Sequence, residues 1–237
     1  GRSFRTDKEI FPEIINRFKI TFQLTIMAVI ISWIIAIPLG IISALKRNTW
    51  IDGVVRFIAL LGVSVPNFAL ATLAILFLSK KFNYYPPVGY VNFTAAPLKN
   101  LEIMLLPSLT LGAIMAGSIM RMTRSSLLEV LNQDFIKTVK AKGASEKVVL
   151  FVHAFKSALI PIITLVGMQI GSLLGGAVVT EQIFSIPGLG QMALTGINQR
   201  DFPVVQGCVL FIAFVNVMIN LIVDILYTYI DPRISLK

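Results

Sequence analysis

Long apolar runs separated by short charged links are the feature that most constrains how this chain can fold. Five of these runs approach the ~20 residues that a helix needs to cross the hydrocarbon core of a bilayer. Only 14% of the 237 residues are charged, whereas soluble chains carry about 25%. We therefore predict an all-α integral membrane protein with five spanning helices, at residues 18–45, 54–79, 102–120, 158–179 and 206–230.

The lysines and arginines between the runs predict which links face the cytoplasm, where basic residues are enriched. They are concentrated in the link between the first and second runs and in the link between the third and fourth, whereas the last link holds only Arg200. The two basic links and the tail at 231–237 are therefore expected to be cytoplasmic. The segment 1–17 is then expected to be extracytoplasmic although it is basic. We therefore expect a further spanning helix upstream, which would bring the total to six.

Several classes of function are excluded by composition. The net charge of +9 does not indicate nucleic-acid binding, because much of it lies in the links between runs. Cys208 and His153 are each the only residue of their type, so the chain offers neither a disulfide framework nor a multi-histidine metal site. The sequence has no phosphate-binding P-loop. We therefore expect no ATP hydrolysis, no catalytic residues and no cofactor in this chain itself.

The link at 121–157 is too charged to cross the membrane and is expected to form two short helices at the inner face. Asp134 is a candidate N-cap for a helix over 135–142. Gly143 suits the C′ position after it, and Ser145 can cap a second helix. The apolar positions of the first helix are expected to share one face: Phe135, Ile136 and Val139. The pattern fits either an ordinary loop or a rigid projection that inserts into a groove on a soluble partner, and spacing does not decide between them.

Ordered blocks along nearly the whole chain resemble one family. They are Ser64-Val65-Pro66-Asn67-Phe68, Thr138-Val139-Lys140-Ala141-Lys142-Gly143-Ala144-Ser145, Gly175-Gly176-Ala177-Val178-Val179-Thr180-Glu181, Phe184-Ser185-Ile186-Pro187-Gly188-Leu189-Gly190, Arg200-Asp201-Phe202-Pro203 and Asp231-Pro232-Arg233. Together they resemble the permease subunits of binding-protein-dependent ABC importers, and more narrowly the dipeptide, oligopeptide and nickel branch. Lys137 and Lys156 depart from the general family, where glutamate and proline are usual, in a way that looks typical of the peptide branch.

The resemblance implies a type I importer transmembrane domain over residues 18–230, with a cytoplasmic coupling helix in the loop at 121–157. It implies transport of di- or oligopeptides by alternating access, with nickel or a metal–metallophore complex as the alternative solute. The implied partners are a second homologous permease, two ATPase subunits that bind ATP and Mg²⁺, and an extracytoplasmic solute-binding protein, at a bacterial inner membrane. The rival class is a secondary transporter or channel that works without ATP, for which Asp224 offers an intramembrane carboxylate.

These expectations assign roles to particular residues. The loop residues expected to contact the ATPase subunits are Asp134, Phe135, Lys137, Lys140, Ala141, Lys142, Gly143, Ala144 and Ser145. Candidates for the translocation path are Asn67, Gln169 and Ser172. Candidates for docking the binding protein lie in extracytoplasmic turns at 185–190 and 200–207: Pro187, Gly188, Arg200 and Asp201. We expect His153 and Asp224 to be structural, with Asn216 and Asn220 forming interhelix hydrogen bonds.

Overall fold

The computed structural model describes residues 1–230, and the predicted tail at 231–237 lies outside the described residues. Regular structure in the described part is helical, apart from one antiparallel bridge between Arg2 and Glu9. In chain order the helices are α1 (Ile10–Leu45), α2 (Trp50–Ser64), α3 (Asn67–Phe82), α4 (Pro97–Leu131), α5 (Asp134–Ala141), α6 (Glu146–Val148), the π-helical turn η1 (Val149–Ala154), α7 (Phe155–Gly176), α8 (Val178–Ile183), α9 (Leu189–Asn198) and α10 (Phe202–Ile230).

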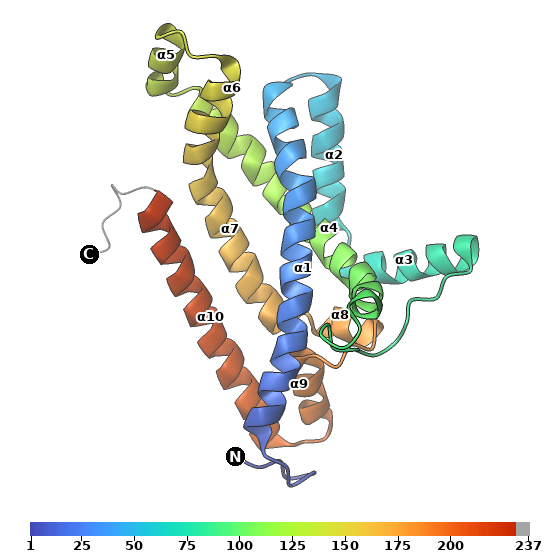
Figure 1. Cartoon of the computed structure of the whole chain (residues 1–237). Helices are drawn as coiled ribbons and strands as arrows, with labels where there is room; N and C mark the ends of the chain where they lie inside the picture. Colours follow the sequence, from blue (N-terminus) through green and yellow to red (C-terminus); the bar gives the residue numbers. More distant parts are fainter. Residues whose placement is uncertain (231–237) are drawn as a thin grey trace.

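Four helical stretches among the described residues are long and apolar enough to cross a membrane, and a bent pair supplies a fifth. The pair is α2 and α3, and the chain bends by 104° between them. The single helix predicted over 54–79 is therefore two helices, broken after Ser64. The cause is Pro66, which lacks an N–H group and pushes the preceding residue, Val65, out of the helical region. Figure 1 shows α3 leaving the bundle sideways at this break.

Several predicted helix ends were also wrong, because hydropathy marks the part of a helix suited to lipid and not the whole helix. The first helix begins at Ile10, eight residues before the predicted start. Its outer turns carry Glu13 and Arg17, an ion pair at 3.4 Å one turn apart. The helix also continues through Pro38. Likewise, α4 runs on to Leu131, and α7 ends at Gly176 before a separate short helix.

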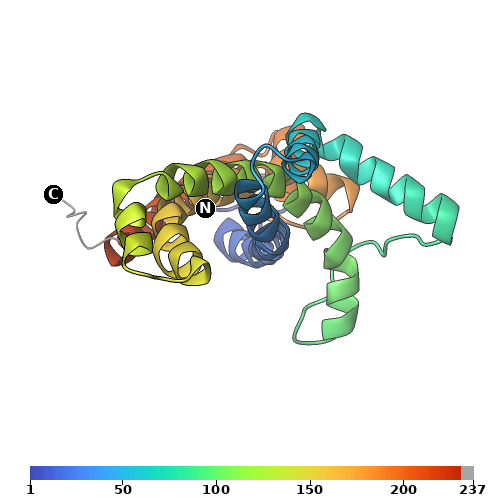
Figure 2. The same cartoon turned by 90° about the horizontal axis from the view of Figure 1, so that it is seen from above.

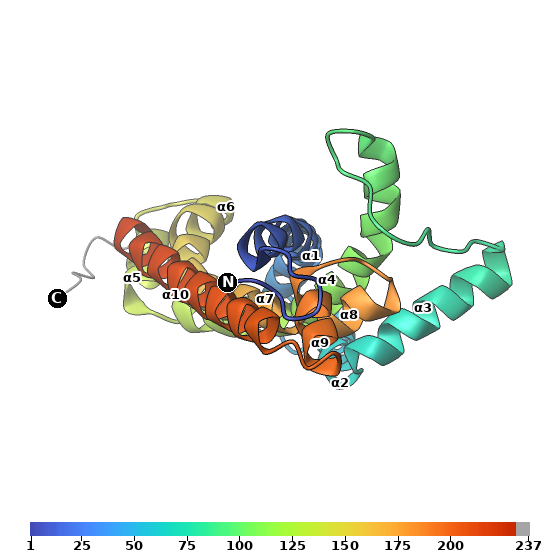
Figure 3. The same cartoon turned by 90° about the horizontal axis from the view of Figure 1, so that it is seen from below.

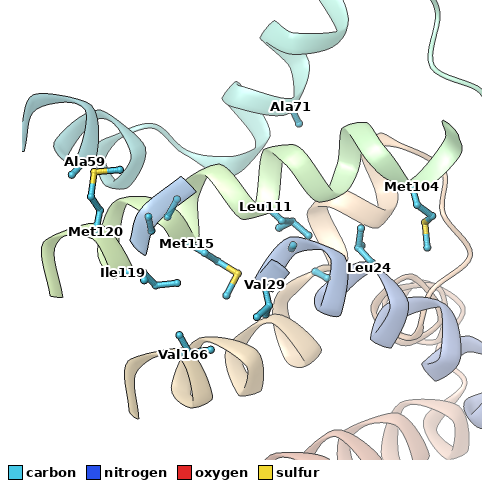
Figure 4. Packing of buried hydrophobic residues seen from close by; sticks show 14 of the residues in the cluster. Leu24, Val29, Ala59, Ala71, Met104, Leu111, Met115, Ile119, Met120 and Val166 are labelled. Atoms are coloured by element: carbon cyan, nitrogen blue, oxygen red, sulfur yellow. The ribbon is translucent and has the colours of Figure 1, made fainter. Parts of the chain in front are cut away.

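The core is centred on α4, which packs against α1, α2 and α7. Figure 4 shows Leu111, Met115 and Ile119 of α4 pointing toward α1 and α7. Two glycines of α4 allow the backbones to approach closely. A Cβ atom at Gly112 would lie 2.8 Å from the carbonyl oxygen of Ala28, and one at Gly117 would lie 2.7 Å from that of Ala59. Small residues permit such close packing between membrane helices.

The two ends of the bundle agree with the predicted alternation of links. The turn between α1 and α2 lies at the same end as α5 and α6, whereas the N-terminal segment and α9 lie at the opposite end (Figure 1). Seen from the end that carries α5 and α6, α4 runs across the bundle between α2 and the short helices (Figure 2). The view from the other end shows the N-terminal segment beside the start of α10, with α3 projecting to one side (Figure 3).

Candidate functional site

The cytoplasmic loop is anchored to the bundle through one side of α5. Ile136 is fully buried and joins a cluster with residues from the ends of α1 and α4, from η1 and from the start of α7: Ala44, Leu127, Val130, Val149, Leu150, Ala154 and Ala158. Val139 packs against the same cluster. Phe135 instead is 40% exposed, so our expectation that it shares their face was wrong. Asp134 occupies the first turn of the helix and not the N-cap position, which Gln133 takes.

A glycine turn connects the two short helices of the loop. Gly143 has a φ of +84°, in the left-handed region that glycine adopts at low cost. Its N–H group donates to the carbonyl of Lys140 at 2.9 Å. Ser145 then takes the N-cap position of α6, as predicted, although its side chain makes no capping hydrogen bond. The turn therefore fixes the direction in which the chain returns to the membrane through η1 and α7.

The rest of the loop surface is open to solvent and basic. Within the predicted contact set, Ala144 is half-buried and the other residues are exposed. Three of the exposed side chains are Lys137, Lys140 and Lys142, and Lys137 donates to Asp134 at 2.8 Å. The structure brings the nine predicted residues together on one projection, with one apolar side held by the bundle and a polar side available to a partner.

The three residues predicted for the translocation path lie on two elements. Gln169 and Ser172 are one turn apart on α7; Ser172 is exposed, and the side-chain oxygen of Gln169 is buried without a hydrogen bond. Asn67 is at the start of α3, where its amide donates to the hydroxyl of Thr180 on α8 at 2.6 Å. The bend between α2 and α3 is thus attached to the segment that follows α7.

Glu181, next to Thr180, organises the segment that carries Pro187 and Gly188. Its fully buried carboxylate accepts hydrogen bonds from the hydroxyl of Thr21 at 2.6 Å and from the N–H group of Gln191 at 2.8 Å. Burial raises the pKa of the Glu181 carboxyl, and these hydrogen bonds oppose the rise. Gly188 is required here, because a Cβ atom would lie 2.1 Å from this carboxylate. Pro187 is half-buried beside it.

The remaining docking candidates, Arg200 and Asp201, differ in exposure. Arg200 is exposed, whereas Asp201 is 2% exposed. The Asp201 carboxylate accepts hydrogen bonds from the hydroxyl of Ser3 and, at 3.2 Å, from the N–H group of Phe4. The Ser3 bond is the main reason why the pKa of Asp201 lies below its usual value. Asp201 thus ties the N-terminal segment to the start of α10. That helix begins at Phe202, four residues before the predicted start of the fifth span at 206.

The polar residues predicted to be structural lie as follows. The side-chain amide of Asn216 donates to the carbonyl of Ile212 at 3.3 Å. This hydrogen bond lies within α10, whereas we predicted one to another helix. The Asn216 side chain does pack on α7, at Gly171. Asn220 and Asp224 are exposed on α10, and His153 is half-buried in η1. No group of three His, Cys, Asp or Glu side chains in residues 1–230 is arranged to hold a metal ion.

A buried ion pair was missed by sequence reasoning. Asp52 of α2 is fully buried, and Arg124 of α4 donates to it through Nε at 2.7 Å and through Nη2 at 2.8 Å. Ser43 at the end of α1 donates to the same carboxylate at 2.6 Å, and the N–H group of Asn48 does so at 3.1 Å. We had counted Arg124 as a topology signal in a link. A signal was present, because an acidic residue near the inner end of a membrane helix needs a partner.

With this geometry in place, comparison with known proteins defines the class. The family described as "Binding-protein-dependent transport system inner membrane component" matches residues 36–236. The chain therefore belongs to this family: it is a membrane-spanning permease subunit of an ABC importer in the inner membrane. Membership implies partner ATPase subunits and a binding protein.

The chain is similar to several permeases over nearly its whole length. It is 44% identical to a putative peptide transport system permease protein of Brucella abortus, over 99% of this chain and 74% of that protein. It is 44% identical to the dipeptide transport system permease protein DppB of Alkalihalophilus pseudofirmus, over 99% of this chain and 77% of the relative. DppB of Escherichia coli is 37% identical, over 100% of this chain and 77% of its own length.

Solved structures support the fold. The MetNI methionine ABC transporter in an inward-facing conformation matches with a TM-score of 0.75 at 17% identity, over 92% of this chain and 95% of the other. An amino acid ABC transporter matches with a TM-score of 0.68 at 14% identity, over 91% and 93% of the two chains. The predicted type I importer fold is therefore confirmed.

Proposed function

We propose that this chain, paired with a second homologous permease, forms the translocation pathway for di- and oligopeptides. The observation that carries the peptide assignment is the 44% identity, over 99% of the chain, to permeases named for peptide and dipeptide transport. Two partner ATPase subunits supply the energy by closing on ATP, and the permeases alternate between inward-open and outward-open states. A solute-binding protein delivers the peptide from outside.

The loop from Asp134 to Ser145 is the handle that the ATPase subunits move. Support comes from its burial pattern: Ile136 is buried against the ends of the long helices, whereas Lys137, Lys140 and Lys142 are exposed. A force on α5 therefore reaches α4 and α7 through packed side chains and not through a flexible linker. On the outer side, the binding protein docks on the segment around Pro187 and Arg200, which Glu181 and Asp201 hold in place.

A substitution at Gly143 tests this coupling. In Gly143→Val a β-branched residue is forced to a φ of +84°, which costs about 1–2 kcal/mol or more in backbone strain. We expect the assembled transporter to lose peptide uptake per ATP hydrolysed. The matched control is Gly143→Asn, because asparagine tolerates the left-handed region and should keep most of the coupling. Uptake and ATPase rates are measured together in proteoliposomes.

If Gly143→Val and the unmodified transporter have the same uptake and ATPase rates, the loop does not couple ATP hydrolysis to transport. The solute is tested separately, by mass spectrometry of the ligand that copurifies with the cognate binding protein. A bound peptide supports the proposal, and nickel or a metallophore complex would replace it with the alternative.

A further inference from the structure

One surface of the bundle carries charged side chains, unlike the exposed side of α1. Between Phe22 and Leu45, every exposed residue of α1 is apolar, as expected for contact with lipid tails. The surface formed by α2, α4 and α7 instead exposes Arg56, Arg121 and Ser172 among apolar side chains such as Leu60 and Met168. Charged side chains on membrane helices face water, protein or a transported solute rather than hydrocarbon. The two arginines therefore mark this surface as a candidate for a polar contact.

A hollow of about 590 Å³ lies at the inner part of this face. Three guanidinium groups, two hydroxyl groups and three apolar side chains line it: Arg56, Arg121, Arg124, Ser118, Ser125, Leu60, Met122 and Leu165. Arg121, Ser118 and Ser125 follow one another at helical spacing on α4. Its walls are held close together, because Gly117 of α4 packs directly on Ala59 of α2.

The charges in the hollow are not balanced by its protein surroundings. The carboxylate beside it belongs to Asp52. Its Oδ1 atom is 2.7 Å from Nε of Arg124 and 3.6 Å from Nε of Arg56, so Arg124 is its main partner. Within residues 1–230, no ion pair or hydrogen bond engages the side chain of Arg121, which is exposed. The hollow thus presents one unpaired guanidinium and a second that is only weakly paired.

We propose that this hollow is an anion site in the inner half of the pathway, and that it holds the C-terminal carboxylate of the transported peptide through Arg121. The proposal rests on the proposed function. A guanidinium pairs with a carboxylate through two parallel hydrogen bonds, and the hydroxyl groups of Ser118 and Ser125 add polar contacts. Arg56 lies six residues after Trp50, the first residue of α2, or about 9 Å along the helix from its start.

The test compares a peptide with its C-terminal amide, which lacks the carboxylate. The assembled transporter with its binding protein is placed in phosphatidylcholine proteoliposomes, and uptake of alanyl-alanine and of alanyl-alanine amide is measured. We expect Arg121→Gln to reduce the preference for the free acid about tenfold or more, since one charged partner is removed. The ratio between variants cancels any preference of the binding protein. Arg121→Lys keeps the charge and should restore part of the preference, and Arg47→Gln in the exposed α1–α2 turn should change nothing.

Two outcomes overturn the proposal. An unchanged ratio in Arg121→Gln would mean that the arginine does not read the carboxylate. If the unmodified transporter takes up the free acid and no amide, the ratio of the two uptake rates has no value. We then measure how much labelled alanyl-alanine the nucleotide-free transporter retains in phosphatidylcholine nanodiscs. Equal retention by Arg121→Gln and Arg47→Gln then refutes the site.

A lipid occupant would give a different pattern. Rates for both peptides would fall equally in Arg121→Gln, and only when phosphatidylglycerol is present in the bilayer. Failure of the proposed function itself is distinguishable, because the unmodified transporter would then take up neither peptide.

Discussion

At the scale of single residues, the pair of Asp52 and Arg124 joins three helices at one end of the bundle. Ser43 from α1 and Arg124 from α4 both donate to the Asp52 carboxylate of α2. Removing one partner of a buried ion pair leaves an uncompensated charge. We therefore expect Arg124→Gln to destabilise the folded protein by about 3 kcal/mol, seen as a lower melting temperature in detergent and a lower yield of assembled transporter.

The matched control for this prediction is the double variant Asp52→Asn with Arg124→Gln. Two neutral amides can still form a hydrogen bond, and replacing both members of a buried pair is much less costly than removing one. Melting temperatures that are equal for the single and double variants would show that the ion pair is not what holds the three helices together.

Residue roles were predictable from the sequence where backbone chemistry decides them. Gly143 was assigned to the left-handed C′ position from the motif alone, and its φ of +84° confirms this. Phe135 could not be placed, because which side of a short helix is buried depends on the inner ends of α1, α4 and α7. Asp52 and Arg124 are 72 positions apart, and without the fold nothing shows that they meet.

At the scale of the elements, glycines set how closely α4 approaches its neighbours. A Cβ atom at Gly117 would lie 2.7 Å from the backbone oxygen of Ala59, which cannot rotate away. We expect Gly117→Val to push α2 from α4 and to destabilise the protein by about 1–3 kcal/mol, the usual cost of overpacking. Thermal unfolding of the purified subunit complex measures this loss.

Gly53 is the control on the partner helix α2. It has nothing within 4 Å of an added Cβ atom, so Gly53→Ala should leave the melting temperature unchanged or slightly raised. A melting temperature for Gly117→Val as high as that of Gly53→Ala would show that α2 and α4 can separate without cost.

The existence and type of the long helices were predictable because apolar runs of this length have few alternatives. Their ends and the bend at Pro66 were not. A proline inside a membrane helix can be tolerated as a kink when neighbours satisfy the freed backbone groups. Here the helix is broken instead, and the hydrogen bond from Asn67 to Thr180 of α8 stabilises the break. The position of α8 beside this break is known only from the fold.

At the scale of the whole molecule, the bundle has unlike faces. Ser172 of α7 is exposed on the face that carries the arginine-lined hollow, and Val217 of α10 is 60% exposed on another helix. If the first face lines the pathway and the second meets lipid, cysteines at the two positions differ in contact with water. A thiol reacts with maleimide as the thiolate, which forms in water and not among lipid tails.

We therefore expect Ser172→Cys in the assembled transporter to react with a water-soluble, membrane-impermeant maleimide about tenfold faster than Val217→Cys, because only the first thiol would ionise readily. Native Cys208 is fully buried and supplies the unlabelled background. Addition of ATP should change the rate at Ser172, since alternating access opens the pathway to one side at a time, and should not change the rate at Val217. Equal and ATP-independent labelling at both positions would place the pathway elsewhere in the complex and remove the basis for a solute contact at Arg121.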